Sequence, residues 1–122
     1  MGARLVSLAL SPVWGDLPDT ARLVLVAMCQ TAKDHPGPTQ ASGQYFAGHD
    51  TLVLTLTGQD PGLPPLRGTP EAAAALKRVK RAVAQLVAAG AIELVQSAHR
   101  GRHAIYQVTP DSRHMDLLPP FD

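Results

Sequence analysis

The chain has 122 residues, a formal net charge of +1 and 45% hydrophobic residues, which is the composition of one globular domain with a modest core. Charged residues make up 17%, so the chain is neither a disordered polyelectrolyte nor a strongly acidic or basic tail. Its longest apolar run, residues 23–29, is far shorter than the roughly 20 residues that cross a bilayer, so no membrane span is expected.

A single cysteine, Cys29, lies inside this apolar run and cannot form an internal disulfide. We therefore expect a buried thiol in a reducing compartment, and a cytoplasmic location. Residues 1–10 carry one positive charge and a very short apolar stretch, which is a poor match to a signal peptide. They are expected to belong to the fold.

The first helix is expected after Asp16, which is a suitable N-cap, with Pro18 in the first turn. Residues 22–30 are apolar in almost every direction around a helix, so this helix should lie at the centre of the core. The prolines of residues 35–38 should end it.

Between residues 39 and 68 the pattern is weaker. Residues 44–46 indicate a short strand. Residues 51–57 have the β-branched alternation of a strand, but Asp50 as N-cap and Gly58 as C-terminal stop favour a short helix. The helix is the preferred interpretation. Residues 59–68, rich in proline and glycine, predict a loop.

The clearest helix is residues 70–89, with Thr69 as cap, Pro70 as first residue and Gly90 as stop. At 100° per residue one side is expected to be core. That side comprises Ala72, Leu76, Val79, Val83, Leu86 and Val87. The opposite side comprises Lys77, Arg78, Arg81 and Gln85.

Two strands are expected after Gly90, at residues 91–95 and 104–108, joined across a turn that contains Gly101. Basic residues concentrate in this half of the chain. Between residues 72 and 110 the six cations Lys77, Arg78, Lys80, Arg81, Arg100 and Arg102 accompany one acid, Glu93.

The tract of residues 76–92, with Gly101, Arg102 and Tyr106 downstream, resembles the recognition helix and wing of winged helix-turn-helix domains. It is similar, more narrowly, to small helix-turn-helix proteins of actinobacteria and their phages and plasmids. The resemblance implies an α+β fold, a mainly helical core with a C-terminal β-hairpin wing. It also implies a single domain over 1–122, with its core at 16–109 and a Pro-rich tail at 110–122.

The residues themselves also favour duplex DNA as partner. Arg78, Arg81 and Gln85 can donate hydrogen bonds to base edges in the major groove. Lys77 and Lys80 are better placed to contact phosphates. The alternative for these side chains is an ordinary solvated surface, which the scarcity of acids makes less favoured.

Arg100 and Arg102 at the expected hairpin tip can reach the minor groove or the backbone, although a solubilising tip is nearly as good an explanation. His99 and His103 flank this tip without a third ligand nearby, so a metal site is not expected, and weak pH-dependent contact with phosphate is the favoured role. The adjacent His49 and Asp50 lack a nucleophile and pocket for catalysis.

These observations predict a sequence-specific double-stranded DNA-binding protein, a transcriptional regulator or an accessory factor of a phage or plasmid. No enzymatic activity, cofactor or small-molecule ligand is expected. The alternative is a winged-helix module that binds proteins, such as an inhibitor or adaptor, because the fold alone does not decide function. The apolar residues of the tail, between 115 and 121, suggest a homodimer contact or packing on the first helix.

Overall fold

The computed structural model describes residues 3–32, 43–45, 47–98, 103–110 and 112. Over these residues the chain forms four α-helices, one short 3-10 helix and a three-stranded antiparallel sheet. In chain order they are α1 (Ala3–Ala9), η1 (Pro12–Trp14), α2 (Asp19–Thr31), β1 (Gln44–Tyr45), α3 (His49–Thr57), α4 (Pro70–Ala89), β2 (Ile92–Gln96) and β3 (Ile105–Val108). The α+β class predicted from the sequence is confirmed.

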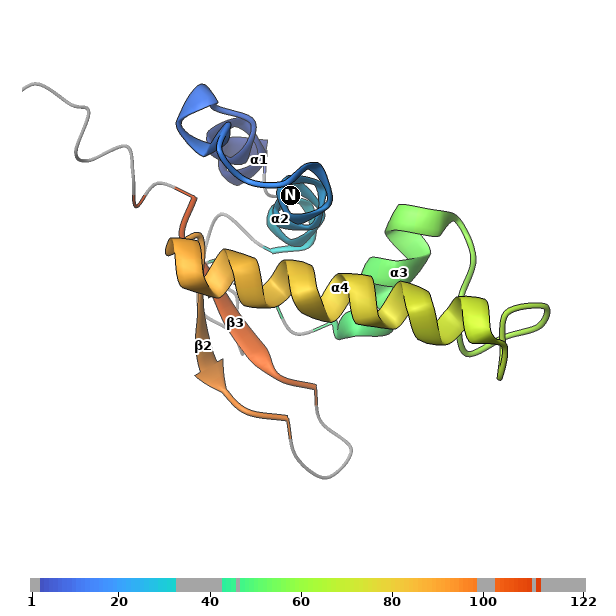
Figure 1. Cartoon of the computed structure of the whole chain (residues 1–122). Helices are drawn as coiled ribbons and strands as arrows, with labels where there is room; N and C mark the ends of the chain where they lie inside the picture. Colours follow the sequence, from blue (N-terminus) through green and yellow to red (C-terminus); the bar gives the residue numbers. More distant parts are fainter. Residues whose placement is uncertain (1–2, 33–42, 46, 99–102, 111, 113–122) are drawn as a thin grey trace, which may run out of the picture.

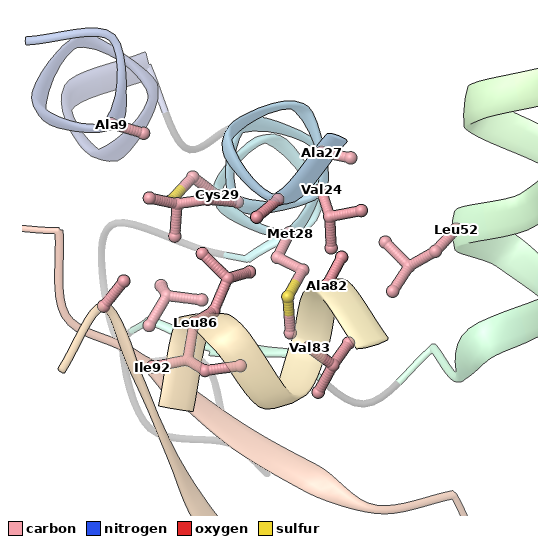
Figure 2. Close-up of a cluster of buried hydrophobic side chains, with 14 of the residues drawn as sticks. Ala9, Val24, Ala27, Met28, Cys29, Leu52, Ala82, Val83, Leu86 and Ile92 are labelled. Atoms are coloured by element: carbon pink, nitrogen blue, oxygen red, sulfur yellow. The ribbon is translucent and has the colours of Figure 1, made fainter. Parts of the chain in front are cut away.

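The core lies between α2 and α4. Figure 1 shows α4 crossing the molecule with α1 and α2 on one side, α3 beside its N-terminal half, and β2 and β3 extending from its C-terminal end. Figure 2 shows Val24 and Met28 of α2 facing Ala82 and Leu86 of α4, with Ile92 of the sheet below them. Each fully buried Val, Leu, Ile or Met side chain contributes about 1.5–3 kcal/mol, so this contact dominates the stability.

Helix α2 begins later than the sequence predicts. Its N-cap is Pro18, whose carbonyl accepts the first helical hydrogen bond from the Arg22 amide at 2.9 Å. The prediction that Asp16 caps this helix is therefore wrong. The helix ends at Thr31, before the prolines of residues 35–38, which lie outside the described residues.

Helix α3 confirms the helical interpretation of residues 51–57. Gly48, not Asp50, is its N-cap, and Gly58 follows its last turn in the left-handed conformation at φ 77°. Asp50 lies in the first turn, so its predicted capping role is wrong. Leu52 and Val53 are buried, and this packing outweighs the weak helix propensity of the segment.

The threonines that suggested a strand satisfy their hydroxyls within the helix. Each donates a hydrogen bond to the carbonyl four residues earlier, Thr51 at 3.0 Å, Thr55 at 2.9 Å and Thr57 at 2.8 Å. The hydroxyls therefore have partners inside the helical segment, although such bonds do not themselves stabilise a helix.

The sheet has the strand order β1-β3-β2, and all neighbours are antiparallel. Strands β2 and β3 match the predicted pair, with Ile92 opposite Val108. Strand β1 confirms residues 44–45 of the predicted strand, while Phe46 lies outside the described residues. Because Tyr45 of β1 pairs with Tyr106 of β3, the strands β2 and β3 are part of a three-stranded sheet and do not form an isolated two-stranded hairpin.

Buried residues also come from the N-terminal segment. Leu5, Ala9 and Trp14 belong to the core cluster, so the core extends before residue 16. The Trp14 indole donates a hydrogen bond of 2.8 Å to the Pro110 carbonyl. This bond joins the segment that precedes α2 to the segment that follows β3.

Candidate nucleic-acid interface

Helix α4 has the ends that its sequence predicts. The Thr69 hydroxyl accepts a hydrogen bond from the Ala72 amide at 3.2 Å, and Pro70 is the first helical residue. Gly90 follows the last turn at φ 80°, and its amide bonds to carbonyls of that turn. These caps fix where the helix starts and stops, while packing on α2 and α3 fixes which side is buried.

The buried side of α4 is partly different from the predicted one. It consists of Ala72, Ala75, Val79, Ala82, Val83 and Leu86. Val87 is 42% exposed, so its predicted place in the core is wrong, and Leu76 is half-buried. The small residues Ala75 and Ala82 face the core and let neighbouring helices approach closely. The centre of the buried side is therefore shifted toward these two alanines and away from Val87.

The other side of α4 is cationic. We call Lys77, Arg78, Lys80 and Arg81 the cationic side; all four are exposed. The helix contains one carboxylate, Glu71, which lies in the first turn. Gln85, the fifth residue predicted to contact DNA on this helix, is half-buried.

The four cations spread over more than one direction. Lys77 and Arg81 point most directly away from the core, because each lies nearly opposite the buried side on the helical wheel. Arg78 lines a pocket of about 140 Å³ between α2, α3 and α4, together with Leu23 and Val53. Lys80 lies on the other flank, near the start of α3, where it influences His49.

A second, smaller pocket of about 70 Å³ lies where α3 meets the sheet. Tyr45, Gly48 and His49 line it from one side, and His103 and Tyr106 from the other. The Tyr45 hydroxyl donates a 2.8 Å hydrogen bond to the Gly48 carbonyl. Burial raises the pKa of both tyrosines, so they stay protonated as donors at physiological pH.

His49 is the titratable group most affected by this environment. Its pKa is lowered by burial first and by the charge of Lys80 next, while Asp50 opposes the shift and His103 adds to it. His49 is therefore neutral at physiological pH. From the sequence, His49 was considered only as a catalytic residue. No local pattern predicts that Lys80 and His103 lie near it.

Arg100 and Arg102, with His99, lie outside the described residues. His103 is described, is exposed and stands immediately before β3. Of the predicted DNA contacts, Lys80 is the one that the structure describes near the junction of α3 and the sheet.

No family model, curated protein or solved structure matches this chain. Among the helices that the structure describes, none combines the length and apolar character that crossing a membrane requires. In the same part of the chain, no three His, Cys, Asp or Glu side chains are grouped as metal ligands would be.

Proposed function

We propose that this chain is a winged helix-turn-helix domain that binds double-stranded DNA. The order of the elements supports this class, because α2, α3 and α4 form a helical unit and β2 and β3 follow α4 directly. In the proposal α4 enters the major groove and the β2–β3 pair is the wing. More particularly, we propose a non-enzymatic, sequence-specific transcriptional regulator or phage or plasmid accessory factor that acts in the cytoplasm.

The observation that carries the proposal is the exposed cationic side of a firmly packed helix. An α-helix fits the major groove, which is about 12 Å wide, and its outward residues then meet base edges and phosphates. Arg81 stands outward as a candidate for two hydrogen bonds to one guanine, and Lys77 beside it as a phosphate contact. Gln85, being half-buried, lies at the edge of this contact area.

The test is a titration of the full chain against a random-sequence duplex at low and moderate salt, read by fluorescence anisotropy. We expect binding that weakens steeply with salt. The double variant Lys77→Gln with Arg81→Gln should bind more weakly and with a shallower salt dependence. Arg67→Gln, an exposed cation in the turn before α4, removes charge elsewhere and serves as control.

Specificity requires its own experiment. Repeated selection of bound duplexes from a random pool should enrich one motif for the parent chain, and Arg81→Ala should relax one position of it. A pool that remains random after selection contradicts sequence-specific binding. Absence of any binding at low salt contradicts the DNA proposal as a whole.

A second candidate function is protein binding, which one observation favours. Among the described strands β2 forms an edge of the sheet, and its Leu94 and Val95 are 45% and 52% exposed. Exposed apolar residues on an edge strand are typical of surfaces that pair with another chain. Sedimentation of the parent and of Val95→Lys tests the homodimer form of this candidate, because a dimer through this edge should dissociate in the variant.

A further inference from the structure

His49 and His103 line one pocket where α3 meets the sheet, and Lys80 of α4 is near enough to act on His49. His49 lies at the start of α3, Lys80 in the middle of α4, and His103 just before β3. Gly48 and His103 are in close contact, since a Cβ on Gly48 would lie 2.6 Å from His103 Nδ1. Lys80 and His103 are both near enough to His49 for their charges to act on it.

The groups that face His49 decide when its imidazole can take up a proton. From α4, Lys80 disfavours a proton on His49, and so does His103 from the sheet side, while Asp50 in α3 favours it. The other titratable groups at this pocket, Tyr45 of β1 and Tyr106 of β3, are neutral. An anion seated here would oppose the effects of Lys80 and His103 and favour the protonated imidazole of His49.

The backbone at the same place presents hydrogen-bond donors. The first amides of any α-helix have no acceptor within the helix. In α3 the N-cap is Gly48, which has no side chain, so no capping side chain competes for these amides. A helix start of this kind attracts an anion through its donors and its dipole, in addition to the three side chains.

We infer that this junction is a phosphate-binding site, in which Lys80, His103 and His49 hold one backbone phosphate of the duplex that α4 enters. The inference rests on the proposed function and deepens it. His49 takes up a proton when the phosphate arrives. By linkage, DNA binding then tightens as the pH falls from about 8 toward the pKa of the free imidazole, by at most about tenfold per pH unit for one proton.

The first experiment compares duplex affinities at pH 8 and pH 6 and constant salt, for the parent and four variants. We expect the parent to bind about three- to thirtyfold more tightly at pH 6. His49→Gln should reduce this ratio, and His103→Gln should weaken binding because it removes one of the three side chains at the site. Lys80→Gln should weaken binding at both pH values and lower the salt slope by about one unit. Lys80→Arg keeps the charge and should keep the slope.

The second experiment needs no variant, so it holds even if a substitution disturbs the fold. The imidazole signals of the parent are followed by NMR across a pH series, alone, with a short duplex, and with inorganic phosphate in place of the duplex. We expect the duplex to raise the pKa of His49. A smaller rise with inorganic phosphate supports the same site chemistry.

Two results overturn the inference while leaving DNA binding intact. One is a parent that binds duplex but whose His49 titrates identically with and without it. The other is a His49 that responds to inorganic phosphate and not to the duplex, which would make the site one for a free anion. If the parent binds no duplex at low salt, the proposed function and this inference fail together.

Discussion

Helices α2 and α4 pack against each other but differ in how much of their surface is buried. Helix α2 contacts α1, α3, α4 and the sheet, and six of its residues are buried. Helix α4 also buries six residues, yet all from one side, and its other side is cationic. Most substitutions in α2 should therefore change stability alone, whereas under the proposed function α4 contains positions at which binding can change without stability.

The largest expected effect is in the α4 core. Leu86 is fully buried, in the cluster that Figure 2 shows, so Leu86→Ala should lower the free energy of unfolding by about 2–5 kcal/mol. Its neighbour Val87 is 42% exposed, and Val87→Ala should cost less than about 1 kcal/mol. Urea unfolding of both variants measures this; equal costs would contradict the assigned buried side.

The second effect concerns two glycines at the ends of α3. Gly48 has φ 89° and ψ 173°, a region open essentially to glycine, and a Cβ there would collide with His103. Gly48→Ala should therefore cost about 2–4 kcal/mol of unfolding free energy. Gly58 is left-handed with open space around it, so Gly58→Ala should cost only about 1–2 kcal/mol. Thermal unfolding that ranks them in the reverse order would contradict the contact between Gly48 and His103.

The third effect separates binding from stability. If α4 enters the major groove as proposed, Arg81→Ala should weaken binding to a selected duplex by about 1–3 kcal/mol through loss of the proposed bidentate guanine contact, with an unchanged thermal midpoint. Lys77→Ala should weaken all sequences alike and lower the salt slope by about one unit. If both variants retain the affinity, specificity and salt slope of the parent, the cationic side is only solvated surface.

The smallest expected effect lies at the start of α4. Thr69→Ala removes the hydroxyl that accepts the Ala72 amide, which should cost about 1 kcal/mol of unfolding free energy. Thr69→Ser retains an acceptor and should recover most of the loss. Differential scanning calorimetry of the two variants measures the contrast, and an equal loss in both would mean that the hydroxyl bond does not stabilise the helix.

The sequence predicts α4 to the residue because its ends carry residues with a specific local mechanism, a hydroxyl cap at Thr69 and a left-handed glycine at Gly90. It fails at the caps of α2 and α3, where Pro18 and Gly48 occupy the position and no side chain caps the helix. The buried side of α4 was predicted incorrectly because two of its residues, Ala75 and Ala82, are alanines. Ala75 and Ala82 carry little hydrophobic signal, although helix packing selects them for their size.

The candidate site shows the same limit. Local sequence is sufficient to find the cationic side of α4, because its spacing follows one helical period. The junction of His49, Lys80 and His103 depends on how α3 and the sheet pack around α4, which no local pattern encodes. The pairing of β1 with β3 was missed for the same reason, since the paired residues Tyr45 and Tyr106 are far apart in the chain.

The indole of Trp14, which donates a hydrogen bond to the Pro110 carbonyl, is an intrinsic fluorescent probe of unfolding. Trp14 is the one tryptophan of the sequence and is fully buried, so a red shift of its emission marks its exposure to water. Circular dichroism follows the helices independently. If the segment before α2 detaches first, the emission shift precedes the loss of helical signal; if the chain unfolds as one unit, the two transitions coincide.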